Sequence, residues 1–160
     1  MSTQVPKHKV ADIPPAARLA VIAARFNEKI VEELLSGCLA RLAELGVEDG
    51  SVEVHRVPGA FELPLAAQVL ARTKRFAAVI CLGAVVRGQT PHFDYVAGQS
   101  AAGINRVSLD ESLPIIFGVL TTNDEQQAWD RAGGAHGHAG RRAAEAALEM
   151  VGLTWHVRTH

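Results

Sequence analysis

Short runs of apolar residues alternate along the chain with longer segments in which apolar residues recur every three or four positions. The runs have strand length, and those without polar positions are typical of strands buried on both faces. The predicted strands are residues 19–24, 52–57, 77–86 and 114–120. The longer segments predict amphipathic helices at residues 28–45, 64–71, 95–109, just after 121–125, and 141–151. This alternation is that of an α/β protein with a four-stranded parallel sheet and helices on both of its faces.

Individual residues mark the ends of several segments. Asn27 is predicted to cap the first helix, and Gly46 ends it. Residues 133–140 are rich in glycine and histidine and are predicted to form a flexible linker before the last helix. Residues 1–17 contain three prolines and little periodicity, which predicts an extended N-terminal arm. Residues 18–160 then form a single α/β domain.

Composition limits the function classes. The chain has 160 residues and a net charge of −1, so no long-range field attracts nucleic acid or an anionic membrane. No apolar run approaches the ~18 residues that a membrane-spanning helix needs, and the N-terminus lacks a secretory signal. The two cysteines, Cys38 and Cys81, lie within apolar runs and predict buried thiols in a reducing compartment. We therefore expect a cytoplasmic protein without nucleic-acid or membrane partners.

Chemically useful side chains follow the predicted strands. In parallel sheets, ligands bind beyond the carboxyl ends of the strands. A flat heteroaromatic ligand could stack on Phe26 there, with Glu62 contacting its polar edge. Residues 88–90 offer backbone N–H groups and a hydroxyl to a phosphate, and His92 can transfer protons near neutral pH. The loops that would meet at this edge are residues 25–27, 58–62, 84–92 and 121–123.

Several blocks of sequence, taken together and in order, closely resemble the lumazine synthases of riboflavin biosynthesis. The blocks are residues 24–27, 57–64, 83–94 and 118–122, with further matches at 125–126 and 131–133. The resemblance runs from about Leu19 to Leu153. It implies a flavodoxin-like three-layer α/β sandwich that condenses 5-amino-6-ribitylaminouracil with 3,4-dihydroxy-2-butanone 4-phosphate. The product is 6,7-dimethyl-8-ribityllumazine, phosphate and water are released, and neither cofactor nor metal takes part.

The resemblance also assigns site residues. It makes His92 the proton-transfer residue. It implies that the pyrimidine substrate binds to Phe26, Ala60, Phe61, Glu62, Ala84, Val85, Val86 and, from an adjacent subunit, Phe117. It implies that the butanone phosphate binds to Gln89, Thr90 and Arg131. Active sites of the family lie between the subunits of a homopentamer, and riboflavin synthase is a candidate partner.

One position departs from the family pattern. Many relatives carry a lysine where this chain has Ala139. The phosphate site then keeps Arg131 and a contribution from a protonated His136 or His138, which predicts weaker phosphate binding but not lost activity. As a metal pair these two histidines lack a carboxylate or cysteine partner, so a role as polar linker residues is favoured.

Structural roles compete with functional ones at other positions. Arg87 is predicted to pair with a carboxylate such as Asp94. Glu62 near a helix start could interact with the helix dipole without touching a ligand. Phe61 and Phe117 could belong to the core.

Assembly and function leave alternatives open. Four strands are few for a stable sheet, so a homo-oligomer is expected. The segment 131–140 is short, as in family members that form icosahedral capsids, which favours a shell of pentamers over a bare pentamer or a decamer. A flavin-storage module and a purely structural shell protein are the alternative functions.

Overall fold

Four parallel strands form the central sheet of the protein. The computed structural model describes residues 13–160. The strands are β1 (Leu19–Ala24), β2 (Val52–Val57), β3 (Ala78–Val86) and β4 (Ile115–Thr122), in the spatial order β2-β1-β3-β4. All three pairings are parallel. Each strand lies within one or two residues of its predicted bounds, so the predicted sheet is confirmed.

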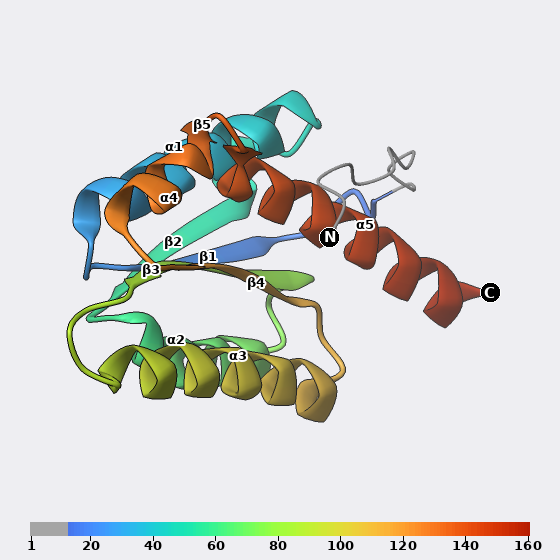
Figure 1. The fold of residues 1–160 in the computed structure, drawn as a ribbon. Coiled ribbons are helices and arrows are strands. Elements are labelled where there is room, and N and C mark those ends of the chain that lie inside the picture. Colours follow the sequence, from blue (N-terminus) through green and yellow to red (C-terminus); the bar gives the residue numbers. More distant parts are fainter. Residues whose placement is uncertain (1–12) are drawn as a thin grey trace.

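Helices cover both faces of the sheet (Figure 1). One layer contains α1 (Glu28–Glu44), α4 (Glu125–Asp130) and α5 (Ala139–Thr159). The other contains α2 (Leu63–Arg72) and α3 (His92–Glu111). The result is the three-layer, flavodoxin-like sandwich that was expected. No helix within the described range 13–160 is long and apolar enough to cross a membrane.

Residues 1–12 of the predicted N-terminal arm lie outside the described residues. The remaining part of that segment makes a turn, in which the Ala17 N–H donates to the Pro14 carbonyl at 3.0 Å. Ile13 and Ala17 pack against the core beside β1. The described end of the predicted arm therefore contacts the domain through Ile13 and Ala17.

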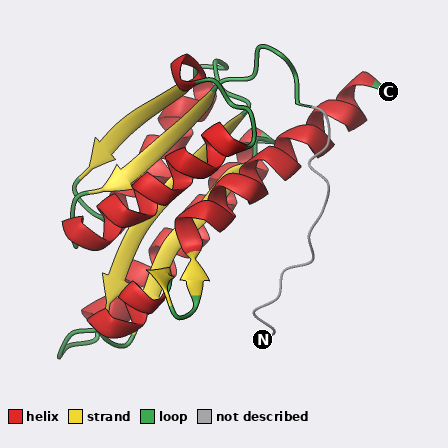
Figure 2. Ribbon diagram, turned by 90° about the horizontal axis from the view of Figure 1, so that it is seen from above, coloured by secondary structure: helices red, strands yellow, loops and turns green. Residues whose placement is uncertain are grey.

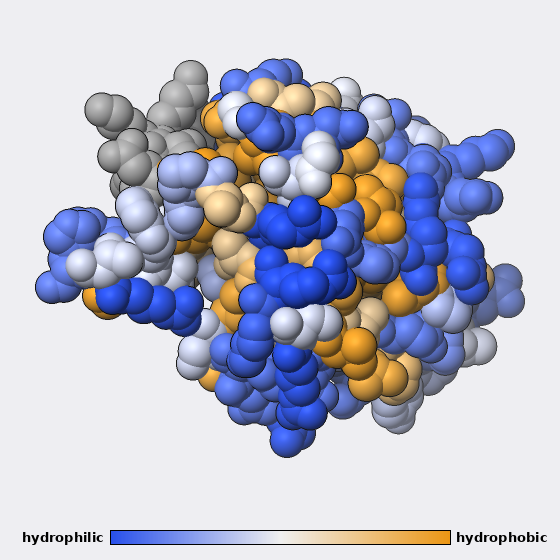
Figure 3. All heavy atoms as spheres, turned by 180° about the vertical axis from the view of Figure 1, so that it is seen from behind, coloured by the Kyte–Doolittle hydropathy of each residue, from blue (hydrophilic) through white to orange (hydrophobic). Residues whose placement is uncertain are grey.

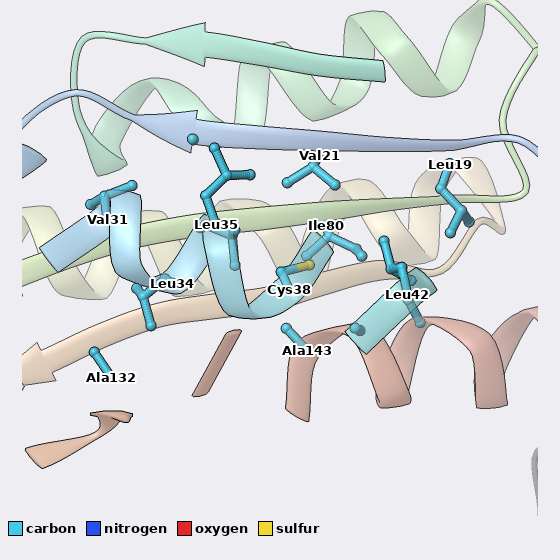
Figure 4. Close-up of a cluster of buried hydrophobic side chains, with 14 of the residues drawn as sticks. Leu19, Val21, Val31, Leu34, Leu35, Cys38, Leu42, Ile80, Ala132 and Ala143 are labelled. Carbon is cyan, nitrogen blue, oxygen red and sulfur yellow. The ribbon is translucent and has the colours of Figure 1, made fainter. Parts of the chain in front are cut away.

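The two central strands supply the core on both sides of the sheet. Alternate residues of β3 point to opposite faces, so Ile80 and Leu82 pack under α1 and α5, whereas Val79 and Cys81 pack under α2 and α3. Figure 4 shows side chains of α1, among them Leu35 and Cys38, directed toward the strands. Small aliphatic residues dominate both clusters, which allows the helices to approach the sheet closely.

The two cysteines are buried thiols, as predicted. Cys38 lies in the layer between α1 and the sheet, and Cys81 lies in the middle of β3. Burial raises the pKa of both thiols to about 12, because a thiolate would lose its hydration there. Both side chains are therefore protonated core residues at neutral pH and are poor nucleophiles.

The segment predicted as a flexible linker is folded, so that prediction was wrong. Its residues form a small antiparallel hairpin of β5 (Ala132–Gly134) and β6 (Gly137–His138), and α5 begins directly after it. Gly133 and Gly137 have φ angles of 105° and 82°, which residues that carry a side chain rarely adopt. The glycines therefore serve a tight turn, and their number gave a false indication of flexibility.

His138 is part of the helix α5 start and not a surface linker residue. Its Nδ1 accepts a hydrogen bond from the backbone N–H of Arg141 at 3.3 Å, which caps the helix. Its ring is mostly buried against α1, where it occupies the space that a side chain on Gly37 would need. The helix α5 itself continues to Thr159, well beyond the predicted end, and projects past the rest of the domain (Figure 2).

A close backbone approach joins α1 and α5. A methyl group on Gly140 would overlap the backbone carbonyl of Leu34, so only glycine lets α5 begin at this distance from α1. The two helices also pack against each other beyond this point.

We expect Gly140→Ala to lower the free energy of unfolding by about 2 kcal/mol, because α5 must move away from α1 to make room for the methyl group. Gly98→Ala is the matched control. Gly98 is also helical, but open space surrounds its Cβ position, so the change should stabilise α3 by up to about 1 kcal/mol. Urea denaturation followed by circular dichroism measures both, and equal stabilities would contradict the proposed contact.

Candidate active site

A pocket opens at the carboxyl ends of β1, β2 and β3. Its volume is about 690 Å³, within the range of about 300–1,000 Å³ that is usual for small-molecule sites. It is lined by Phe26, Pro58, Gly59, Ala60, Phe61, Glu62, Ala84, Val85, Val86, Gly88, Thr90, His92, Phe93, Tyr95 and Val96. Most of the predicted site residues are therefore brought together, as the parallel sheet requires.

Backbone hydrogen bonds fix the Phe26 side of the pocket. The Arg25 N–H donates to the Val57 carbonyl at 2.8 Å, and the Phe26 N–H donates to the Pro58 carbonyl at 3.0 Å. These bonds continue the β1–β2 ladder beyond the sheet. The Phe26 and Phe61 side chains remain 72% and 57% exposed. Two large aromatic rings held at the pocket with this much free surface are suited to binding a planar apolar ligand.

Asn27 joins the first loop to β3. Its backbone is left-handed, with φ 56° and ψ 47°, and its side-chain Nδ2 donates to the Ala84 carbonyl at 2.8 Å. The predicted side-chain cap of α1 is absent, although Asn27 does occupy the N-cap position. The amide group is used for a long-range contact, because Asn27 tolerates the left-handed turn that leads into the helix. This contact holds Phe26 beside Ala84.

Glu62 fixes the loop after β2. Its Oε2 accepts a hydrogen bond from the Gly59 N–H at 2.9 Å, which stabilises the short 3₁₀ turn of Ala60–Glu62. The side chain also lines the pocket. Glu62 can therefore have both of its predicted roles, at the helix start and in ligand binding. The structural hydrogen bond uses one carboxylate oxygen and leaves the other available to a ligand.

The start of α3 forms the opposite side of the pocket. His92 is the first residue of the helix, and its backbone N–H points to the Thr90 hydroxyl at 3.4 Å. Three pocket residues, His92, Tyr95 and Val96, are spaced by three and four positions and so share one face of the helix. Tyr95, which is 70% exposed, and Val96 were missed from the sequence because the helix was predicted to begin only at Tyr95. Their helical spacing from His92 was the signal that could have identified them.

Arg87 has the structural role predicted for it. Its Nη2 lies 3.5 Å from Asp94 Oδ1, its Nε donates to Asn123 Oδ1 at 3.2 Å, and its guanidinium carbon lies 4.4 Å from the centre of the Phe93 ring. Arg87 does not line the pocket. It contacts α3, the helix that carries His92.

Three predicted site residues lie outside this pocket: Gln89, Phe117 and Arg131. Phe117 is in the first half of the edge strand β4 and is 44% exposed. Arg131 follows α4, and its Nη1 donates to the Gln127 carbonyl at 3.0 Å. The Ala139 N–H donates to the Arg131 carbonyl at 2.7 Å, so these two residues are neighbours. One chain therefore does not bring all predicted residues together.

Within residues 13–160, no three or more His, Cys, Asp or Glu side chains are grouped as metal ligands. His136 and His138 are separated in role, because the mostly buried His138 caps a helix whereas His136 lies in the exposed turn of the hairpin. The chemistry of the pocket is thus that of aromatic, hydroxyl, carboxylate and imidazole groups.

Comparison with known proteins agrees with this picture. A family described as 6,7-dimethyl-8-ribityllumazine synthase matches residues 16–154. The chain belongs to the lumazine synthase family. A protein of that name from Protochlamydia amoebophila is 51% identical over 86% of this chain and 80% of its own length. Others from Syntrophus aciditrophicus and Coxiella burnetii are 50% and 48% identical, over 88% and 85% of this chain and 92% and 90% of their own lengths.

The match to the lumazine synthase family includes every residue that lines the pocket, since these lie between Phe26 and Val96. It also includes Phe117, Arg131 and Ala139. The last turn of α5, beyond residue 154, lies outside the matched range.

We expect Asn27→Gly to keep the fold but to lower the free energy of unfolding by about 1 kcal/mol, because glycine permits the left-handed turn yet cannot bond to Ala84. Asn27→Val should cost about 2–3 kcal/mol, since a β-branched residue also strains that backbone. Chemical denaturation measures both. Wild-type stability in Asn27→Gly would show that the amide contact does not hold the loop.

Proposed function

We propose that this chain is a lumazine synthase in the strict sense. It condenses 5-amino-6-(D-ribitylamino)uracil with 3,4-dihydroxy-2-butanone 4-phosphate to 6,7-dimethyl-8-ribityllumazine, the penultimate step of riboflavin biosynthesis. The observation that carries the proposal is a pocket at three strand ends, with two exposed phenylalanine rings and a histidine, in a member of this family. The relatives compared above bear the same enzyme name.

The pocket suits the pyrimidine substrate. The planar ring stacks on Phe26, and the residues after β2, Ala60, Phe61 and Glu62, bind its polar edge and ribityl chain. The end of β3, from Ala84 to Val86, forms the floor. A cavity of about 690 Å³ has room for this molecule together with a four-carbon phosphate.

The reaction needs no nucleophile from the protein. The 5-amino group of the pyrimidine attacks the ketone and forms an imine with loss of one water. The imine loses phosphate, which leaves a new carbonyl, and attack of the ribitylamino nitrogen on that carbonyl closes the ring with loss of a second water. Holding two small molecules in reacting geometry supplies much of the acceleration. His92 transfers protons between these steps, an effect usually worth about 10²–10⁴-fold. Phosphate binds near Gln89, Thr90 and the positive end of α3, and Arg131 forms parallel hydrogen bonds with it.

A neighbouring subunit completes the site. Phe117 and Arg131 lie outside the pocket of their own chain, toward the β4 edge of the sheet. A head-to-tail arrangement places this edge of one subunit against the pocket of the next and closes into a ring. Apolar side chains reach the surface between polar ones, as Figure 3 shows for one face, and an assembly would cover such surface.

The ring we propose is a pentamer in the cytoplasm, and twelve pentamers of this kind close into an icosahedral shell. The short β5–β6 hairpin supports a shell, because it leaves no long insertion between α4 and α5. Riboflavin synthase, which consumes the product, is the protein partner proposed for the assembly.

We expect the purified protein to form fluorescent lumazine from the two substrates, and His92→Ala to slow turnover by about 10²-fold without dissociating the oligomer. His156→Ala, near the exposed end of α5, is the control and should keep wild-type turnover. Unchanged turnover in His92→Ala would reject its role. Stoichiometric bound flavin without condensation would favour storage over catalysis.

A shared site predicts complementation between two inactive variants. When His92→Ala and Arg131→Ala chains are mixed, unfolded and refolded together, about a quarter of the neighbouring pairs combine an intact His92 with an intact Arg131. We expect activity to reappear in the mixture, while each variant refolded alone stays slow. Sedimentation of the wild type tests the assembly in parallel. If the refolded mixture is no more active than the two variants refolded separately, each chain holds its own complete site.

A further inference from the structure

The Arg87 guanidinium lies where three separate segments of the chain meet. Arg87 itself follows β3, Phe93 and Asp94 form the first turn of α3, and Asn123 belongs to the loop after β4. The side chain contacts all three: Nε donates to Asn123, Nη2 lies 3.5 Å from Asp94, and the guanidinium stacks on Phe93. No other arginine in residues 13–160 has ion-pair, amide and aromatic contacts together.

One side of this junction is hydrogen-bonded to the end of the sheet. The backbone N–H of Arg87 donates to the Thr122 carbonyl at 2.8 Å, directly beyond the paired residues Val86 and Thr122. Arg87 is thus held as an extension of the β3–β4 ladder. Its Nε–Asn123 bond, at 3.2 Å, adds a second tie to the same loop. Because the Arg87 backbone and Nε are both bonded to the end of the sheet, the guanidinium can hold Phe93 and Asp94 in a fixed position relative to the sheet.

The other side of the junction is the turn that carries His92. Between Arg87 and the helix, the hydrogen bonds recorded for this part of the described chain are local: Thr90 with the His92 N–H, and Pro91 with the Asp94 N–H. Apolar packing of Phe93 and Val96 holds α3 on the sheet, but apolar contacts have little directional preference. The contacts that link this turn to the end of the sheet through a polar group are those of the Arg87 guanidinium, which lies 3.5 Å from Asp94 and stacks on Phe93.

We propose that Arg87 is a positioning residue for His92. It fixes the first turn of α3 against the end of the sheet and so holds the imidazole at the pocket. The proposal rests on the proton-transfer role given to His92 above. Arg87 itself does not line the pocket, so it acts through the helix start and not by touching substrate.

The partial exposure of the pair determines how this role would be recognised. The Arg87 and Asp94 side chains are 44% and 61% exposed, and ion pairs of this kind add little to global stability. Misplacement of a reacting group by about 1 Å can nevertheless cost about 10²-fold in rate. A positioning residue is therefore expected to affect turnover far more than the unfolding midpoint, whereas a structural residue would change both together.

A double-mutant cycle tests the coupling. We expect Arg87→Gln to lower kcat about 10-fold, with the KM of the pyrimidine changed less than about 2-fold because the Phe26 and Ala60 walls remain. In the His92→Ala background the same change should lower kcat no further. Arg87→Lys keeps the charge without the planar fork and should recover part of the loss. Multiplicative losses in the double variant, or wild-type kcat in Arg87→Gln, would overturn the proposal.

Arg72→Gln is the matched control, because Arg72 pairs with Glu111 at the opposite end of the same helix, at 2.9 Å. It should leave kcat unchanged. Hydrogen exchange gives a readout that does not need activity: amides of residues 92–95 should exchange faster in Arg87→Gln and at the wild-type rate in Arg72→Gln. Unchanged exchange in Arg87→Gln would also overturn the proposal. If the wild-type protein forms no lumazine, the proposed function is contradicted. Hydrogen exchange at residues 92–95 would still test whether Arg87 holds the first turn of α3.

Discussion

Parallel pairing of β1 with both β2 and β3 is the constraint on which the site depends. The registers Ala24 with Val57 and Ala23 with Leu82 bring the ends of three strands to one edge, so the loops that follow must meet. The backbone bonds from Phe26 to Pro58 and the amide bond from Asn27 to Ala84 extend this register into the loops. A slip by one residue would move Phe26 out of line with both neighbours and would place the buried side chains of β1 on the wrong faces.

The same arrangement leaves Phe117 outside the pocket of its own chain. Loops after the first three strands in the chain order make the pocket, whereas β4 lies at the sheet edge with Phe117 on its open surface. The sheet has only four strands, and small residues dominate its core. Exposed rings at the pocket and at the β4 edge therefore have a common physical reason, which is that each surface has too few residues of its own chain to cover it.

Sequence predicted what depends on local pattern. Strands were found within one or two residues because uninterrupted apolar runs such as 78–86 have few alternatives in a buried sheet. The pocket followed from loops placed after those strands. The hairpin before α5, the early start of α3 at His92 and the long-range bond of Asn27 were not predicted. The hairpin and the Asn27 bond depend on contacts with distant segments or on a left-handed backbone, and neither leaves a periodic trace in the sequence. The start of α3 did leave one, because His92, Tyr95 and Val96 have helical spacing.

The hairpin also shows what surrounds Ala139, the position at which the family resemblance leads us to expect a lysine. The Ala139 N–H donates to the Arg131 carbonyl, so this position is a neighbour of the arginine that we propose binds phosphate. His138 is held in place at the start of α5, because its Nδ1 accepts a hydrogen bond from the Arg141 N–H and its ring packs against Gly37. His136 lies in the exposed turn and has no such constraint. Of these two histidines, His136 is therefore the one whose side chain is free to turn toward a phosphate that we propose binds at Arg131.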